Sequence, residues 1–320
     1  MRTACILCFA ISVILSGQAW GWGCTGHEVV ALIALNHLRP DVKANVEQLL
    51  STQTHDYAGR FCSDLSLDPI AYYATWADDY RGSHPETAPW HFWDIPLSKT
   101  TAAANQYCDK GCVVQALNDQ LAILRDSSQD QQKRAMALMF VIHFAGDLHQ
   151  PLHAEDNNDR GGNCVPVNFF GDNTKETNAG TGAYTPNLHG VWDTQLVENV
   201  GGISKRNQAG VEAFAQKIDT DKAKTIKKAA AERIDFVAWG NQSHSLARKD
   251  PYKKLPTRIA AAKTVAPVTE CSDLDTSLNL AKLNESINAS YVSAVQNDVE
   301  LQLAKAAGRL AGILNSVWAQ

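Results

Sequence analysis

Residues 140–153 read FVIHFAGDLHQPLH. We expect a helix over 131–147, because the apolar residues of this segment recur at helical spacing. On that helix His143 and Asp147 are four residues apart, so both side chains project from one face about one turn apart. The proline two residues before His153 ends or bends the helix and turns that histidine toward a different centre. An imidazole and a carboxylate placed in this way suit two ligands of one metal ion.

Histidine and aspartate occur together in other short stretches as well. His189 and Asp193 are again four residues apart, the stretches WADDYR at 76–81 and WHFWD at 90–94 follow one another, and His27 lies near the amino end. One such pair alone is more often a salt bridge on a helix surface. Their repetition beside Trp, Gly and Pro favours metal ligands, and imidazole and carboxylate without thiolate suit zinc in a hydrolytic site.

The remaining histidines lack such neighbours and are interpreted as surface or core residues. For His149 two roles stay open: it could support a metal ligand, or it could pack at a helix end. The histidines set aside are His37, His55, His84 and His244.

Composition excludes several classes of protein. The chain has 320 residues, of which 45% are hydrophobic and 20% charged, and these values are typical of a folded globular chain. Its formal net charge of −5 excludes a basic protein that coats nucleic acid. An anionic substrate remains possible if bound metal supplies the positive charge.

Residues 1–21 read MRTACILCFAISVILSGQAWG and have the pattern of a secretory signal peptide. An uncleaved membrane anchor is the alternative, but the apolar stretch is short for a span. Cleavage would leave Trp22 as the new amino terminus. An even number of cysteines in an exported chain predicts up to three disulfides, with Cys108 and Cys112 close enough for a local bridge. The remaining cysteines would be Cys24, Cys62, Cys108, Cys112, Cys164 and Cys271.

The mature chain, residues 22–320, is predicted to be a single all-α domain, mainly helical with at most a short β hairpin. Only 164–170 reads as a strand, and 155–163 and 171–186 read as loops. The helices are expected over 26–38, 41–50, 66–79, 113–125, 131–147, 209–218, 223–245 and 273–314, the last broken near Asn284 or Asn288. Acceptor patterns for N-linked glycans occur at Asn241, Asn284 and Asn288.

Taken together, the motifs resemble the zinc-dependent, single-strand-preferring nuclease family of the S-one/P-one type. That family shares its fold with bacterial zinc phospholipase C. The matching stretches run in the family's order and are WGCTGH at 22–27, WAD at 76–78, HFWD at 91–94, HFAGDLHQPLH at 143–153, GGN at 161–163 and NLHGVWD at 187–193.

The resemblance implies a phospholipase C/nuclease-like fold that holds three Zn²⁺, and every ligand position has a residue of the required type. One zinc would take Asp78, His91, His143 and Asp147. A close neighbour would take His27, Asp147 as a bridge, and the free α-amine and carbonyl oxygen of Trp22. The third would take His153, His189 and Asp193.

The resemblance also implies an activity. The chain would be an exported endonuclease, secreted or periplasmic, that hydrolyses single-stranded RNA and DNA to 5′-phosphorylated products by attack of a metal-bound hydroxide. It would also remove 3′-phosphates from nucleotides. We expect a monomer with no stable membrane insertion after the signal is removed. Asp78 and Asp147 would be catalytic as metal ligands.

Three further roles are implied near this centre. Arg81 would be catalytic by steadying phosphoryl oxygens, although a surface ion pair with Asp79 or Glu86 is an equal alternative. Phe92 and Asp94, with Asn163, would bind a nucleobase, the ring by stacking and the carboxylate by accepting from base N–H groups. Phe92 could instead be a core aromatic, because Trp90 and Trp93 flank it.

Two other classes of function stay open. A zinc phospholipase C would use the same metals on a lipid head-group phosphodiester, and a non-enzymatic protein could sequester zinc without turnover. The stretch 171–186 looks long and rich in Gly, Thr and Asn for the family, and it could alter substrate preference.

Overall fold

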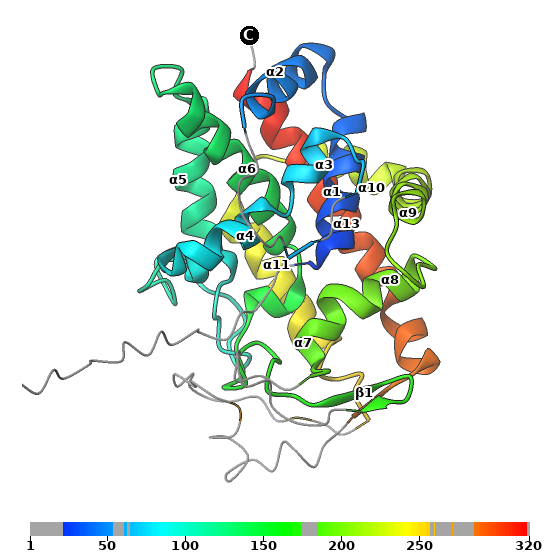
Figure 1. Cartoon of the computed structure of the whole chain (residues 1–320). Helices are drawn as coiled ribbons and strands as arrows, with labels where there is room; N and C mark the ends of the chain where they lie inside the picture. The colour runs from blue at the N-terminus through cyan, green and yellow to red at the C-terminus, as the bar shows by residue number, and fades with distance from the viewer. Residues whose placement is uncertain are drawn as a thin grey trace, which may run out of the picture.

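A computed structural model describes residues 22–53, 61–62, 65–173, 185–256, 259, 271 and 285–318. Within that part, helices stack around the long carboxy-terminal helix (Figure 1). The α-helices are α1 (Cys24–Asn36), α2 (Pro40–Leu50), α3 (Pro69–Tyr73), α4 (Trp76–Ser83), α5 (Val113–Arg125), α6 (Gln131–Asp147), α7 (Leu188–Gly190), α8 (Leu196–Val200), α9 (Gln208–Asp221), α10 (Ala223–Ala230), α11 (Phe236–Lys249) and α13 (Ala289–Val317). Shorter helical turns are η1 (Pro85–His91), η2 (Pro151–Ala154) and η3 (Val191–Gln195).

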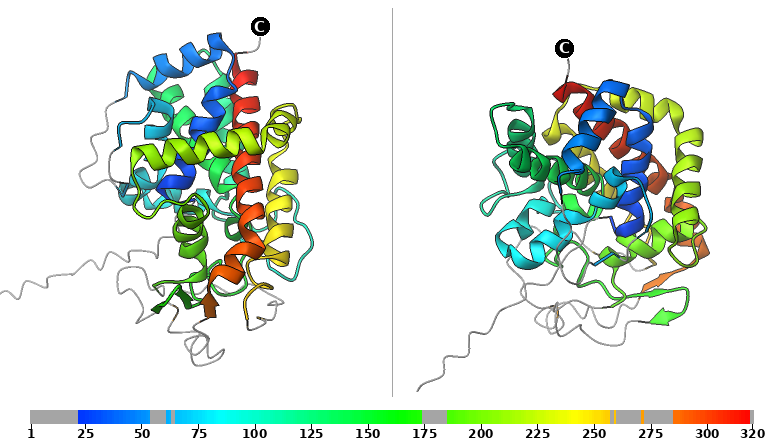
Figure 2. Two further views of the ribbon diagram at one scale, coloured as in Figure 1. Left: turned by 90° about the vertical axis from the view of Figure 1, so that its right-hand side faces the viewer. Right: turned by 45° about the horizontal axis from the view of Figure 1, so that its top comes forward.

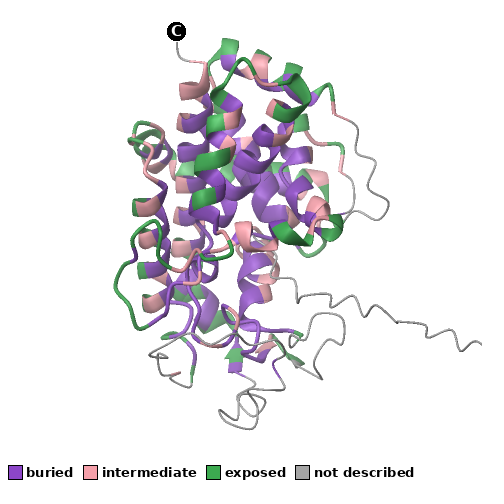
Figure 3. Cartoon of the chain, turned by 90° about the vertical axis from the view of Figure 1, so that its left-hand side faces the viewer, coloured by how far each residue is buried: buried purple, intermediate pink, exposed green. Residues whose placement is uncertain are grey.

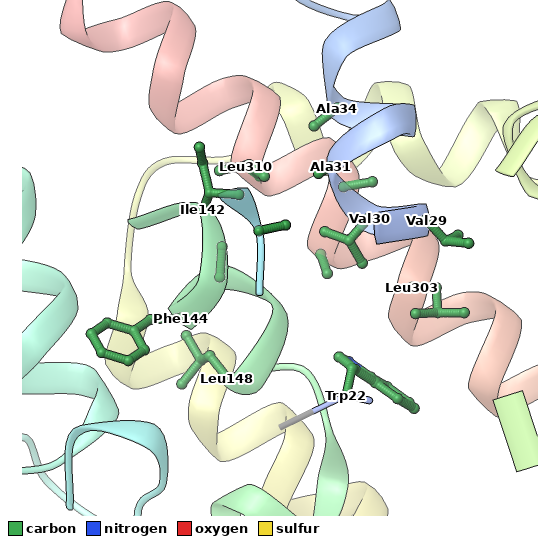
Figure 4. Close-up of a cluster of buried hydrophobic side chains, with 14 of the residues drawn as sticks. Trp22, Val29, Val30, Ala31, Ala34, Ile142, Phe144, Leu148, Leu303 and Leu310 are labelled. Carbon is green, nitrogen blue, oxygen red and sulfur yellow. The ribbon is translucent and has the colours of Figure 1, made fainter. Parts of the chain in front are cut away.

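Three helices build the centre of the core. α1 packs against α13, and both contact α6. Their apolar side chains meet in one cluster, which Figure 4 shows with Val30 of α1, Ile142 of α6 and Leu310 of α13. α6 is buried on almost all sides from Ala135 to Asp147, as expected of a helix without a polar face. Because α6 is held so firmly, the ligand-type residues near its carboxy-terminal end have a rigid support.

The longest helix runs through most of the molecule. α13 is a single helix from Ala289 to Val317, and the left view of Figure 2 shows it from end to end. Asn288 caps its start by accepting hydrogen bonds from the backbone N–H groups of Ser290 and Tyr291. The predicted helix over 273–314 thus begins only after Asn288, residues 285–287 form a strand instead, and 273–284 lie outside the described residues.

A small sheet lies at the opposite end of the molecule from the carboxy terminus (Figure 1). β1 (Val167–Phe169) pairs antiparallel with β2 (Asp172–Asn173) and parallel with β3 (Glu285–Ile287), in the order β2-β1-β3. The all-α class is confirmed, and the expected hairpin is extended by the one short strand that precedes α13.

Two predicted helices are divided in the structure. The segment 66–79 forms α3 and α4, and the segment 223–245 forms α10 and the first part of α11. In the second case Asp235 accepts a hydrogen bond from the N–H of Ala238 and starts a new helix there. Periodicity does not show this break, since apolar residues continue on both sides of it.

Three disulfides join the six cysteines named above. The predicted local bridge between Cys108 and Cys112 is present. Cys24 pairs with Cys62, and Cys164 with Cys271 across 107 residues of sequence. Bridges that close long loops restrict the unfolded chain most.

Burial follows the helices closely. In Figure 3 the inward faces of the helices are buried, and exposed residues lie on their outer faces and in the connections. None of the helices in the described part of the chain is both long and apolar enough to cross a bilayer. The signal peptide expected at 1–21 lies outside the described residues.

Candidate metal centre

Histidines and aspartates converge where several helices end or begin. They come from the first turn of α1, the first turn of α4, the end of η1, the end of α6, η2, and the turns α7 and η3. Three groups have ligand atoms within 4.8 Å of one another, and every member is buried. The groups are His27–Asp78–His143, His91–His143–Asp147 and His153–His189–Asp193.

The densest group surrounds the end of α6. His143 Nε2 lies 3.1 Å from Asp147 Oδ2, as the four-residue spacing predicts. His91 Nδ1 lies 3.0 Å from the same oxygen. Asp78 Oδ1 is 3.7 Å from both of these ring nitrogens. Two imidazoles and two carboxylates thus share one small volume.

The other oxygen of Asp147 faces a different histidine. His27 Nε2 lies 3.3 Å from Asp147 Oδ1, and its ring stacks on His143 with 3.9 Å between centroids. Gly146 makes this approach possible, since a Cβ there would lie 2.7 Å from His27 Nδ1. The two oxygens of Asp147 are therefore directed at two separate sets of imidazoles, which is the arrangement a bridging ligand needs.

Trp22, the first residue that the structure describes, lies at the same place. Its side chain is fully buried, and the backbone N–H of Gly23 donates to the carbonyl of Asp193 over 2.8 Å. Gly26 leaves room for the indole, because a Cβ at that position would lie 2.6 Å from the Cβ of Trp22. Residues 22 and 23 are thus held next to Asp193 of the third group.

The third group combines η2 with the turns α7 and η3. His153 Nε2 and His189 Nε2 are 3.0 Å apart, and Asp193 Oδ2 is 3.3 Å from His189 Nε2. Asp193 lies in η3, which is a turn of π-helix. π-turns inside helices are frequent at functional sites, since they redirect single side chains.

Most of these imidazoles are held by their far nitrogen. His143 Nδ1 bonds to the carbonyl of Ala74 at 2.7 Å, His153 Nδ1 to that of His91 at 2.8 Å, and His189 Nδ1 to that of Gly161 at 2.6 Å. A carbonyl accepts only from N–H, so each ring carries a proton on Nδ1 and directs its Nε2 into the group. This fixed tautomer is typical of histidines that ligate metals.

The remaining polar atoms of the groups fit a divalent cation better than they fit each other. When both rings are neutral, His153 Nε2 and His189 Nε2 are two acceptors that face each other, so neither can satisfy the other. Several buried atoms have no hydrogen-bond partner, among them both ring nitrogens of His27, Asp78 Oδ1 and Asp147 Oδ1. Buried polar groups without partners are costly, so their concentration here indicates a bound cation.

The charged side chains at the end of α6 shift one another's pKa values. Burial alone would favour the neutral carboxyl of Asp147, but His143, together with the nearby His27 and His91, holds its pKa well below the usual range. Burial likewise opposes the charged form of His143, yet Asp147 and Asp78 raise its pKa to about 9. For His91, burial and the nearby Arg81 lower the pKa to about 4.

Arg81 lies inside the molecule rather than on its surface. Its side chain is 3% exposed, and Nη2 lies 3.6 Å from Asp78 Oδ1. Burial lowers its pKa, while Asp78, Asp147 and Asp193 favour the charged form. The alternative of a surface ion pair is therefore wrong. The guanidinium is within electrostatic reach of carboxylates from all three groups.

Burial alternates along residues 91–95, at and after the end of η1. His91, Trp93 and Ile95 are buried, whereas Phe92 and Asp94 are partly exposed. Phe92 and Asp94 are thus the two members of this segment that solvent reaches, and both are close in sequence to His91. The indole N–H of Trp93 donates to the carbonyl of Gln106, which identifies Trp93 as the core aromatic.

Asp94 faces an acidic loop. Burial and the neighbouring Asp156 raise its pKa to about 8. Asp156 in turn accepts hydrogen bonds from the backbone N–H groups of Asp159 and Arg160. Asn163 follows in the same loop, where it is buried and its amide donates to the carbonyl of Arg160. Its side chain is thus engaged with its own loop.

His149 turns away from the three groups. Its Nδ1–H donates to the carbonyl of Ala145, and Arg309 of α13 donates to its Nε2 over 2.7 Å. His37, His84 and His244 also lie outside the groups, as expected, and His55 is outside the described residues. Helix-end packing is therefore the correct interpretation of His149.

Sequence reasoning missed Gln150. Its amide donates to Asp193 Oδ1 over 2.5 Å, although the two residues are far apart in sequence. The position of this glutamine directly between Asp147 and His153 was the available signal.

Comparison with known proteins agrees with this centre. The sequence model of the S1/P1 Nuclease family matches residues 22–319. Nuclease S1 of Aspergillus oryzae is 28% identical over 97% of this chain and 96% of its own length. Nuclease P1 of Penicillium citrinum is 26% identical over 92% of this chain and 97% of its own length, and Endonuclease 2 of Arabidopsis thaliana is 28% identical over 65% of this chain and 68% of its own length. The chain therefore belongs to the S1/P1 nuclease family, a family of metal-dependent phosphodiester hydrolases.

Proposed function

We propose that this protein is an exported zinc-dependent endonuclease that cleaves single-stranded RNA and DNA to 5′-phosphorylated products and also removes 3′-phosphates from nucleotides. The signal peptide would be residues 1–21 and the enzyme a monomer formed by residues 22–320, secreted or periplasmic. The observation that carries the proposal is the convergence of three buried His/Asp groups in a chain of this family.

Three Zn²⁺ would be held by the side chains that the groups bring together. The first would be held by Asp78, His91, His143 and Asp147. The second would be held by His27, Asp147 and the backbone amine and carbonyl oxygen of Trp22. The third would be held by His153, His189 and Asp193. When bound, zinc supplies activation of water as a nucleophile near neutral pH and stabilisation of negative charge on the phosphoryl group.

The protein's own residues would orient the phosphodiester. Arg81 is buried, charged and close to Asp78, so its guanidinium is placed to donate to phosphoryl oxygens as their negative charge increases. The side chains of Asp78 and Asp147 would fix the relative position of the cations, and in this sense both are catalytic. Carboxylates from all three groups keep the guanidinium protonated.

Phe92 and Asp94 would select the strand. Both are partly exposed and follow His91 closely in the sequence. A ring there can stack on a base, and the carboxyl group of Asp94 can hydrogen-bond its edge. Bases in a duplex are stacked and paired, so such a pocket favours single strands. Asn163 belongs to the neighbouring loop and would line the same pocket.

The test compares two consecutive carboxylates of α4. Asp78 faces the first group, whereas Asp79 Oδ1 accepts from the backbone N–H of Phe61. The chain starting at Trp22 is supplied with zinc and assayed on single-stranded DNA, single-stranded RNA, duplex DNA and phosphatidylcholine. We expect cleavage of both single strands, at least 100-fold loss in Asp78→Asn, and little change in Asp79→Asn.

Other results would reject the proposal. Turnover of phosphatidylcholine alone would assign the site to a phospholipase C. Zinc binding without turnover of any substrate would remove the enzymatic role. Equal rates for the two variants would remove Asp78 from the ligand set.

A further inference from the structure

Gln150 is a buried amide between the proposed metal-binding groups. It is fully buried and follows the end of α6 by three residues. Its Oε1 accepts from the backbone N–H of Leu152 at 2.6 Å, and its Nε2 donates to Asp193 Oδ1 at 2.5 Å. The orientation of the amide is determined by these partners, since Leu152 N can only donate and the carboxylate can only accept.

This contact distinguishes the two oxygens of Asp193. Oδ1 is occupied by the amide and lies 3.8 Å from His153 Nε2. Oδ2 lies 3.3 Å from His189 Nε2 and is directed into the group. A carboxylate held by one oxygen can rotate little about its terminal bond, so Oδ2 stays directed at the position between the two imidazoles.

The contact also connects distant parts of the chain. Asp193 belongs to the π-turn η3, whereas Gln150 lies between Asp147 at the end of α6 and His153 in η2. The amide therefore joins the segment carrying ligands for two groups to the carboxylate of the third. Within the described part of the chain, the Gln150 amide is thus the side-chain donor that holds the Asp193 carboxylate.

We propose that Gln150 is a positioning residue that presents Asp193 Oδ2 to the third metal ion and thereby sets the affinity for that ion. This rests on the proposed three-zinc centre. Donors that orient a ligating carboxylate typically change metal affinity by about 10–100-fold when removed. The amide leaves the other two ions unaffected, because it contacts none of their side-chain ligands.

A purely structural role for Gln150 predicts a different outcome. Its Oε1 caps the first turn of η2, and that cap alone could explain a buried glutamine. Gln150→Glu keeps an oxygen for the N–H of Leu152 but removes the donor to Asp193, whereas Gln150→Met removes both. A cap alone would therefore tolerate glutamate, and a positioning role would not.

The matched control is another buried glutamine. Gln302 of α13 donates to the backbone carbonyl of His149 and does not contact a ligand side chain. Gln302→Met thus removes a buried amide of the same kind from the far side of the same segment. Circular dichroism confirms that each variant is folded before metal binding is compared.

The experiment counts zinc during stepwise chelation of the chain that begins at Trp22. We expect both Gln150 variants to release one of three zinc ions at chelator concentrations about 10–100-fold lower than wild type, and to keep the other two unchanged. Cobalt substitution should show the altered coordination spectrum of one ion only. Gln302→Met should release zinc as wild type does.

The results separate this inference from the proposed function. A Gln150→Glu variant that holds all three zinc ions within twofold of wild type would overturn the positioning role. Wild type that binds fewer than three zinc ions but cuts single-stranded DNA would overturn it too and leave the nuclease in place. Fully loaded wild type that cuts no nucleic acid would reject the nuclease, while the zinc release data still decide the role of Gln150.

Discussion

Asp147 is the residue whose two oxygens serve different sets of ligands. Oδ2 lies near His91 and His143, and Oδ1 near His27. Asp78 Oδ1 also lies near this place, but at 3.7 Å it is farther from the nitrogens of His91 and His143 than Asp147 Oδ2 is. The side chain therefore supports metal binding and also keeps three buried imidazoles from facing one another without a counter-charge.

Removing this carboxylate should abolish metal binding at both adjacent positions. For Asp147→Ala we expect activity to fall to background, zinc content to fall by two ions, and stability to fall by roughly 3 kcal/mol or more, because an ion present at a hundredfold of its Kd stabilises by about that amount. Metal analysis and denaturant unfolding measure these effects. Unchanged zinc content would contradict the ligand assignment.

Asp94 should make stability depend on pH. Burial and Asp156 raise its pKa from 3.8 to about 8, so the folded state binds this proton more tightly than the unfolded chain does. The stabilising contribution is complete below pH 4 and is lost as pH rises toward 8. The charged carboxylate then opposes folding.

Replacing Asp94 with the neutral amide tests this dependence. Asp94→Asn should raise the melting temperature by about 2 °C or more at pH 8.5, since roughly 1 kcal/mol corresponds to such a shift in a chain of this size. At pH 4 the variant should gain nothing. Thermal unfolding of both proteins at the two pH values gives the comparison, and an equal gain at both would show that ionisation of Asp94 is not the cause.

The candidate ligands could be predicted from sequence because each lies in a short motif. The four-residue spacing of a helical turn identifies two of these pairs, His143 with Asp147 and His189 with Asp193. Gln150 could not be predicted in this way, because its partner is 43 residues away and no local pattern records the contact. Burial of Arg81 was equally inaccessible, since its sequence neighbours Asp79 and Glu86 suggested a surface pair.

At the scale of elements, α10 and α13 approach so closely that glycine is required. A Cβ at Gly312 would lie 2.6 Å from the carbonyl oxygen of Ala230, and one at Gly308 would overlap the carbonyl oxygen of Ile226. Backbone atoms cannot move aside as a flexible side chain can. The two glycines therefore set the separation of the two helices.

Alanine at one of these glycines should separate the helices. Gly308→Ala should lower stability by about 1–3 kcal/mol, because overpacking outweighs the gain of up to ~1 kcal/mol from better helix propensity. Gly82→Ala in α4 is the matched control, since nothing lies within 4 Å of a Cβ there. We expect it to be neutral or stabilising. Chemical denaturation measures both, and an equal effect would mean that close packing is not limiting.

Most elements were predictable because strong periodicity meets clear boundaries. α5 and α6 have the predicted bounds, and Asp130 caps α6 by accepting from the N–H groups of Gln132 and Lys133. The predicted helix over 223–245 was wrong in the middle, where the cap at Asp235 interrupts a continuous apolar pattern. Strand β3 depends on pairing with β1, more than 100 residues earlier, and could not be predicted from its own three residues.

At the scale of the whole molecule, the candidate ligands come from the amino-terminal part and the middle of the chain, and the carboxy-terminal helix supports them. α1 and α6 supply candidate ligands and both pack on α13, which supplies none of the three groups. Arg309 and Gln302 of α13 hold the segment after α6 by bonding the ring and carbonyl of His149. Formation of the centre therefore requires the completed fold, which explains why metal binding and folding should be coupled.

Processing of the amino terminus should control activity. The side chain of Trp22 is buried, and Gly23 is fixed to Asp193, so the terminal amine is placed beside the centre. While Trp22 is joined to Gly21, its nitrogen is an amide and a poor ligand, whereas a free α-amine with a pKa near ~8 can bind zinc. A chain retaining residues 1–21 should therefore be inactive or nearly so, with one zinc ion bound more weakly.

Specific activity and zinc content of the processed and unprocessed chains provide the measurement. Cleavage of purified unprocessed protein between Gly21 and Trp22 should restore both, and comparable activity before cleavage would show that the amine is not a ligand.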